Sequence, residues 1–105
     1  PLPREGVLEV AFTLQSEADP LQLDIVLSAR NADDQVIYAD VTGVNWIRPH
    51  WQGERLHFRR PFSLPEGAHS MICYFWNPKK THYEVTVEPV QLLQAAPTNS
   101  AERGF

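Results

Sequence analysis

Apolar and polar residues alternate with a period of two along most of the chain, and this feature most constrains the fold. Residues 6–14 show the alternation, and residues 21–29 repeat it with greater regularity. Successive side chains of a β-strand point to opposite faces, so this period indicates strands with one buried face. Helical periodicity is absent beyond a turn or two, and residues 90–96 are the only segment where we allow one helical turn.

The same pattern predicts further strands, separated by turn-forming residues. The additional strands are expected at 35–44, 54–64, 71–76 and 83–87. Asn31-Ala32-Asp33-Asp34 predicts a hairpin, because Asn and Asp side chains cap their own backbone and tolerate turn geometry. Pro65-Glu66-Gly67-Ala68 predicts a tight turn. Short strands at this spacing favour an all-β, antiparallel β-sandwich, jelly-roll or immunoglobulin-like, of about six to eight strands.

Two segments carry apolar residues on both faces. Met71–Trp76 has no polar face, which predicts a strand buried on both sides at the centre of the core. Gln35–Val44 predicts a central strand or one with a packed outer face. We expect the two sheets to close over Leu23, Ile25, Phe58, Phe75 and Val85.

The composition is that of one globular domain. The chain has 105 residues, 43% of them hydrophobic and 21% charged, which fits a single β-sandwich over residues 1–94. Residues 95–105 are small, polar and aperiodic, so we expect a flexible C-terminal tail. Because the chain begins at Pro1 without a methionine, we expect a piece of a longer protein.

Charge and cysteine content exclude several partners. A net charge of −4 argues against nucleic acid, which requires a concentrated basic surface. The single cysteine, Cys73, excludes an internal disulfide and a multi-cysteine zinc site, and its apolar surroundings predict a buried, unreactive thiol. No run approaches the length of a membrane span, so we expect no direct membrane insertion of this segment.

A cluster of aromatic and polar residues interrupts the alternation near the middle of the chain. It consists of Trp46, Arg48, His50 and Trp51. Exposed tryptophans stack on sugar rings, and the arginine and histidine would donate hydrogen bonds to hydroxyl groups. Alternatively, both tryptophans pack over one end of the sandwich and cover its core. The cluster is therefore a candidate ligand-binding site.

A second candidate is a basic strip on the strand predicted at 54–64. Arg55, His57 and Arg59 share one face of that strand, and Arg55 and Arg59 could bind a phosphate, an anionic glycan or a lipid headgroup. The alternative is a solvated outer face on which these residues pair with Glu84 and Glu88 across the sheet.

No catalytic or metal-binding motif is legible. The four histidines lack the spacing of a zinc motif. Asp33, Asp34 and Asp40 fit turns and surfaces better than a calcium site or a carboxylate pair. No nucleophile and base arrangement or phosphate loop stands out. We expect a non-enzyme without cofactor or metal.

The last third of the ordered chain resembles a known domain type. Residues 62–68, then Tyr74-Phe75-Trp76-Asn77-Pro78-Lys79-Lys80, then the strand at 83–87, resemble galactose-binding-like jelly-roll domains, related to carbohydrate-binding modules, of bacterial surface proteins. In that pattern the final strand carries an acidic pair near its end, where this chain has Val85-Thr86-Val87-Glu88. The resemblance implies carbohydrate or surface attachment in some members and a structural accessory role in others.

Together these observations favour a non-catalytic accessory β-sandwich domain of a larger extracytoplasmic or membrane-linked protein. It would mediate structural or protein contacts with other domains of its parent protein, in the periplasm or at the cell surface. The alternative is a carbohydrate-binding module that uses exposed tryptophans.

Overall fold

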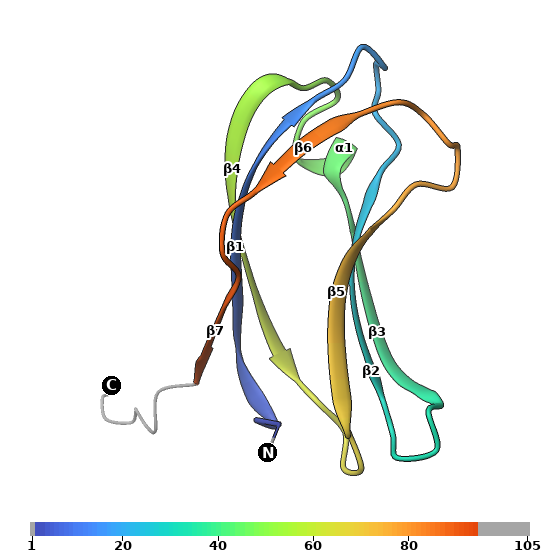
Figure 1. The fold of residues 1–105 in the computed structure, drawn as a ribbon, viewed down its shortest axis with the longest axis vertical. Helices are drawn as coiled ribbons and strands as arrows, with labels where there is room; N and C mark the ends of the chain where they lie inside the picture. Colours follow the sequence, from blue (N-terminus) through green and yellow to red (C-terminus); the bar gives the residue numbers. More distant parts are fainter. Residues whose placement is uncertain (1, 95–105) are drawn as a thin grey trace.

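The computed structural model describes residues 2–94, which form an antiparallel β-sandwich (Figure 1). The elements in chain order are β1 (Glu5–Gln15), β2 (Asp24–Arg30), β3 (Val36–Gly43), α1 (Val44–Ile47), β4 (Gln52–Ser63), β5 (Ser70–Trp76), β6 (Glu84–Val87) and β7 (Gln91–Gln94). The predicted fold class is confirmed, and the strands lie within a few residues of their predicted positions.

Each sheet is built around one central strand. In one sheet β1 pairs with β4 along one edge, and with β6 and then β7 along the other. In the second sheet β2 pairs with β3 and β5. β6 and β7 therefore act as one interrupted strand beside β1. The central strands β1 and β2 carry most of the buried hydrophobic side chains.

The core lies between the two sheets, as the alternation predicts. Leu23 and Ile25 are buried, and Phe58, Phe75 and Val85 pack against the same cluster. Burying one side chain of this size contributes about 1.5–3 kcal/mol, so this layer is the main source of stability.

The predicted turns between the strands are present. Asn31 Oδ1 accepts hydrogen bonds from the backbone N–H groups of Asp33 and Gln35, at 3.0 and 2.9 Å, which closes the β2–β3 hairpin. Ala68 N–H donates to the carbonyl of Pro65 at 3.3 Å, and Gly67 has a φ of 95°. Glycine adopts that angle without the steric cost that a Cβ imposes.

Two predictions about strand position are wrong. β5, expected at the centre of the core, is an edge strand, and its side chains Ile72, Tyr74 and Trp76 are exposed. β3, expected to be central or covered on its outer face, is the opposite edge strand, with Val41 exposed on that face. An apolar pattern on both faces shows what both faces are made of, but a local pattern carries no information on whether a further layer covers them.

Three smaller predictions also need correction or lie beyond the described residues. Cys73, expected to be buried, is exposed, because β5 is an edge strand. A helical turn is considered above for residues 90–96, but Gln91–Gln94 form the strand β7. The one helix among residues 2–94 is α1. The tail predicted at 95–105 lies outside the described residues.

One flank of the sandwich is joined by an ion pair. Arg60 of β4 donates two hydrogen bonds to the carboxylate of Asp40 in β3, one of them at 2.7 Å between Nη2 and Oδ1. Arg60 and Asp40 oppose the buried Leu8 and Leu27 in their ladders, so both point between the sheets. This pair links the edge strands β3 and β4 across the two layers.

Candidate functional site

The loop that carries the predicted ligand-binding cluster is tied to the β1–β2 connection by backbone hydrogen bonds. Ser16 N–H donates to the carbonyl of Trp51 at 3.0 Å, and Leu21 N–H donates to the carbonyl of Pro49 at 2.9 Å. Val44 N–H donates to the carbonyl of Leu23 at 2.9 Å. The loop is therefore a fixed part of one end of the sandwich.

The two tryptophans of this cluster occupy opposite environments. Trp46 is 70% exposed, whereas Trp51 is 1% exposed. The Trp51 ring packs 6.3 Å from the Phe12 ring, measured between centroids. Neither alternative drawn from the sequence describes both residues, because Trp51 covers the core and Trp46 does not. A sugar ring has no access to Trp51. Of the two tryptophans in the predicted site, only Trp46 can therefore contact a sugar.

The polar members of the cluster are engaged with neighbours. The Arg48 guanidinium lies 5.5 Å from the centroid of the Trp51 ring, and its Nη2 is 3.6 Å from a Glu54 oxygen. His50 Nδ1 lies 3.1 Å from Asp19 Oδ2. A hydrogen bond from Gln52 N–H, with a smaller contribution from Arg48, lowers the pKa of the Glu54 carboxyl. Arg48 and His50 thus turn toward different carboxylates and do not converge on one ligand.

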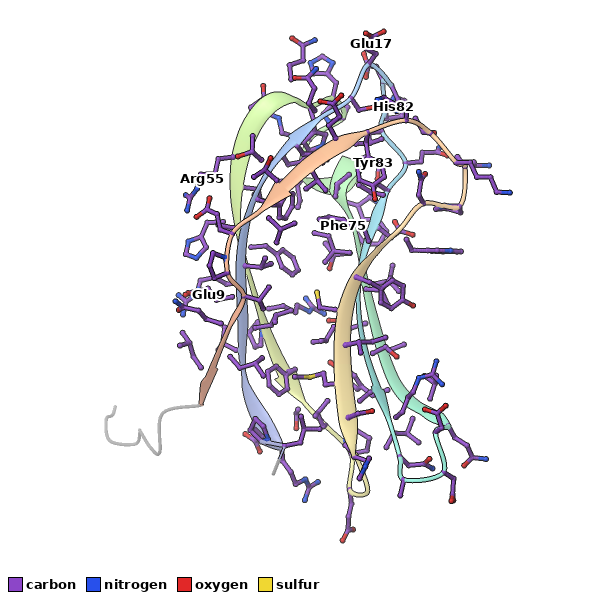
Figure 2. The ribbon with its side chains drawn as sticks, in the orientation of Figure 1. Glu9, Glu17, Arg55, Phe75, His82 and Tyr83 are labelled. Atoms are coloured by element: carbon purple, nitrogen blue, oxygen red, sulfur yellow. The ribbon has the colours of Figure 1, made fainter. Side chains whose placement is uncertain are left out.

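The basic strip lies on the outer face of the β1–β4 sheet, where both arginines meet carboxylates. Arg55 donates two hydrogen bonds to Glu88, at 2.6 and 2.9 Å. Arg59 Nε lies 2.7 Å from a Glu9 oxygen, and His57 Nε2 lies 3.6 Å from the same atom. Figure 2 shows Arg55 and Glu9 on this face, away from the other sheet. A shallow depression of about 220 Å³ lies among these groups.

These ion pairs balance the positive charge of the strip. The side-chain hydrogen bonds between Arg55 and Glu88 raise the pKa of the arginine and lower that of the carboxyl. An incoming phosphate would have to displace Glu88 from Arg55 and Glu9 from Arg59. The geometry matches the solvated, paired face that the sequence also allowed, with Glu88 as one predicted partner.

The groups that most often carry chemistry are dispersed over the described chain. Among residues 2–94, no group of three or more His, Cys, Asp or Glu side chains is arranged to hold a metal ion. Desolvation by its apolar neighbours raises the pKa of the Cys73 thiol, which disfavours the nucleophilic thiolate.

A further feature of the surface is the outer face of the β3–β2–β5 sheet, which we call the apolar face. It is defined by exposed side chains on both edge strands, each at least 42% exposed, namely Val36, Val41, Ile72, Tyr74 and Trp76. In register across the sheet, Val41, Val26 and Tyr74 form one row on this face. A cluster of exposed large apolar side chains on one face often marks an interaction site.

The sequence contained a signal for this face, but we interpreted it as burial. Its two edges are β5, where the run Met71–Trp76 predicts a strand buried on both sides, and β3, where Gln35–Val44 predicts a central strand or one with a packed outer face. The composition of these strands was therefore informative, and only the assumption that both faces lie inside the protein was wrong.

Trp46 extends the apolar face at one end. A Cβ built on Gly43 would lie 3.0 and 3.1 Å from atoms of the Trp46 indole. Gly43 opposes Asp24, which in turn opposes Trp76 on the far strand. The Trp46 indole thus lies against Gly43, at one end of the cross-strand row Gly43, Asp24 and Trp76. The close approach of the indole explains why a glycine stands at position 43.

Comparisons with known proteins add no relative. No protein-family model matches the chain, and neither a curated protein nor a solved structure matches it. Over the described residues, none of the helical structure is long and apolar enough to cross a membrane.

Proposed function

We propose that this domain is a non-catalytic accessory module of a larger extracytoplasmic or membrane-linked protein, and that it docks through its apolar face onto another folded domain. The observation that carries the proposal is the exposed apolar surface on β3 and β5. The cellular location rests on the resemblance of residues 62–87 to jelly-roll domains of surface proteins.

The makeup of the apolar face supports a protein partner. Its centre is aliphatic and aromatic, with Val26 and Tyr74 side by side. Charged residues stand at its ends, where Asp24 opposes Trp76 and Arg30 opposes Ser70. An apolar centre with a polar rim is the usual anatomy of a protein interface, and tyrosine and tryptophan are enriched at such centres.

Hydroxyl-radical footprinting tests this proposal. The oxidation of Tyr74, Trp76 and Ile72 is measured in the isolated chain and in the complete polypeptide that contains it. Docking predicts strong protection of these residues in the complete polypeptide, and Ile72→Asp should remove that protection. Equal oxidation in both samples would refute docking through this face.

A second candidate function is carbohydrate binding, which is favoured by the Trp46 indole against Gly43 in the same row as Asp24 and Trp76. Indole faces stack on the apolar faces of sugar rings, and a nearby carboxylate can accept hydrogen bonds from hydroxyl groups. This site differs from the predicted one, since Trp76 takes the place of Trp51.

A glycan array probed with the folded chain separates the two candidates. Sugar recognition predicts binding that Trp46→Ala and Trp76→Ala each weaken, whereas Val36→Thr at the other end of the same face leaves it unchanged. An array without signal above background would remove the carbohydrate candidate and leave protein docking untouched.

A further inference from the structure

Two edge strands border an apolar groove along one flank of the sandwich. β5 lies on one side of this flank, and β6 with β7 lies on the other (Figure 1). The wall residues are Met71, Cys73 and Phe75 on one side and Val87, Val90 and Leu92 on the other. Core residues of β1 and β2 form its floor, so the groove opens directly onto the hydrophobic core.

The residues on the β6–β7 wall face the core but remain in contact with solvent. Val87 opposes the buried Phe12, and Leu92 opposes the buried Leu8. Both side chains therefore point between the sheets, yet both are exposed. On the opposite flank, Arg60 and Asp40 join β4 to β3. The groove flank has no equivalent closure among the described residues.

The wall formed by β5 also presents an unpaired backbone edge. β5 pairs with β2 over all of Ser70–Trp76, and its other edge pairs with no strand among residues 2–94. Free N–H and C=O groups in an extended row are recognised by another extended chain. The β6–β7 wall is a poorer template, because Pro89 and a change of register interrupt it.

The geometry points to strand addition at this flank: β5 accepts an extended segment of a different polypeptide, whose alternate side chains are apolar and fill the groove. This site lies on the flank, apart from the apolar face, and the inference does not depend on the proposed docking there.

The dimensions of the groove fit a strand. It contains two adjoining pockets of about 120 Å³ and about 150 Å³, which share Cys73 and Val90 as lining residues. Like-facing side chains of a strand recur every second residue, about 7 Å apart. No charged residue lines either pocket, so consecutive inward positions of the added strand would carry aliphatic or aromatic side chains.

Two other occupants fit less well. Residues 95–105 contain Phe105 as their only large apolar side chain, so this segment cannot supply an alternating apolar row. The β5 strand of a second copy could pair with this edge through its backbone. Its inward side chains would not fill the groove, however, because they already pack on the core of their own molecule. Phe75, for example, lies 5.3 Å from Phe12 between ring centroids. The occupant is therefore a strand from another polypeptide.

Selection from a phage-displayed library of random peptides tests the inference. The folded chain is the target, and the enriched peptides are then assayed against the Val90→Lys variant. Val36→Lys is the matched control, because Val36 and Val90 are both 52% exposed and only Val90 lines the groove. Circular dichroism confirms that each variant is folded.

Strand addition predicts enriched peptides with alternating large apolar residues. Binding should slow amide exchange over residues 70–76 and slow the reaction of Cys73, the only thiol, with Ellman's reagent. Val90→Lys should weaken binding about tenfold or more, since a buried unpaired charge costs more than the 1.4 kcal/mol that a tenfold change represents. Val36→Lys should leave it unchanged.

Three results would overturn the inference. The first is the absence of enriched clones, and the second is enriched peptides that leave amide exchange over residues 70–76 unchanged. The third is self-association of the chain without peptide, if that association slows amide exchange in β5. Failure of the strand-addition test would not affect the proposal of docking through the apolar face. The footprinting test measures oxidation of residues on that face in the complete polypeptide.

Discussion

At the scale of single residues, Trp46 and Trp51 show how the same side chain serves two purposes within one loop. Trp46 follows Gly43, which lets its ring lie against the outer face of a sheet. Trp51 precedes β4 and turns inward onto Phe12. Its indole Nε1 is buried without a hydrogen-bond partner in the described structure, so Trp51 stabilises the fold through its apolar area.

Trp51→Ala should therefore be among the most destabilising substitutions in the chain. Removing a fully buried large aromatic side chain costs about 3–5 kcal/mol. Urea unfolding followed by far-ultraviolet circular dichroism measures the loss. Trp46→Ala is the control and should change the free energy of unfolding by less than about 1 kcal/mol, since most of that ring is already in water. Equal losses for the two variants would contradict the assignment of Trp51 to the core.

A second prediction at this scale concerns acid stability. Hydrogen bonds from Arg55 lower the pKa of Glu88 below its ordinary value of 4.5. A carboxyl with a depressed folded-state pKa stabilises the protein above the unfolded-state pKa, and this contribution disappears as the pH falls through the folded-state pKa.

Glu88→Gln should lower the urea midpoint slightly at about pH 7 and have progressively less effect as the pH falls through the folded-state pKa of Glu88, where the wild-type carboxyl also becomes neutral. The effect is small, because the pair is exposed. Glu66→Gln in the 65–68 turn is the control, since Glu66 has no ion-pair partner among residues 2–94, and it should show no such difference. A loss for Glu88→Gln that grows toward low pH would contradict the prediction.

At the scale of elements, the link between β6 and β7 decides which side chains face the groove. Val87 opposes Phe12 and Gln91 opposes Glu9, so three residues of the link lie opposite two of β1. One extra residue reverses the inward and outward phase of a strand. The irregularity at 88–90 thus keeps Leu92 facing the core, whereas an unbroken ladder would turn it outward.

β7 depends on a glycine in the strand beside it. A Cβ on Gly6 would lie 2.5 Å from the carbonyl oxygen of Leu93 and 3.1 Å from the ring of Phe62. Gly6→Ala should therefore displace β7 from β1 and cost about 1–3 kcal/mol, as overpacking does. Hydrogen exchange should accelerate at residues 91–94. Residues 52–63 are the internal control, because the longer β1–β4 ladder should retain its protection. Uniform loss of protection would contradict local displacement.

At the scale of the whole molecule, the two flanks of the sandwich differ. On one flank β3 and β4 are joined by the ion pair of Asp40 and Arg60. The hydrogen bonds of Asp40 raise the pKa of Arg60, which keeps the guanidinium charged at any ordinary pH. On the other flank, apolar side chains of β5 and β6–β7 line an open groove. The molecule therefore has one closed flank and one available for interaction.

Arg60→Ala should destabilise the whole fold by about 1–2 kcal/mol, because Asp40 would remain largely buried without its partner. The expected loss of stability is closer to about 1 than to about 2 kcal/mol, because water reaches the partners and screens the pair. The Arg60 side chain is 44% exposed, against 17% for Asp40. The double variant Asp40→Ala/Arg60→Ala should recover part of the loss in urea unfolding. A double variant less stable than Arg60→Ala would contradict the prediction.

The sequence alone determined the fold class, most strand positions and the turns. The period of two in residues 21–29 and the hydrogen-bonding side chain of Asn31 act over short distances, so local patterns carry that information. The same patterns identified Leu23 and Ile25 as core residues. They also identified the face of Arg55 and Arg59 and named Glu88 as a partner, although the choice between a paired face and a binding strip stayed open.

Only the tertiary structure decided which strands lie at the edges and which apolar faces remain open. Strand order is set by contacts between residues far apart in the chain, and no local pattern in Met71–Trp76 distinguishes a covered strand from an edge strand. For the same reason the environments of Trp46 and Trp51 could not be told apart, and the exposure of Trp76 was missed. Burial is a property of the whole assembly of layers, whereas periodicity is a property of each strand by itself.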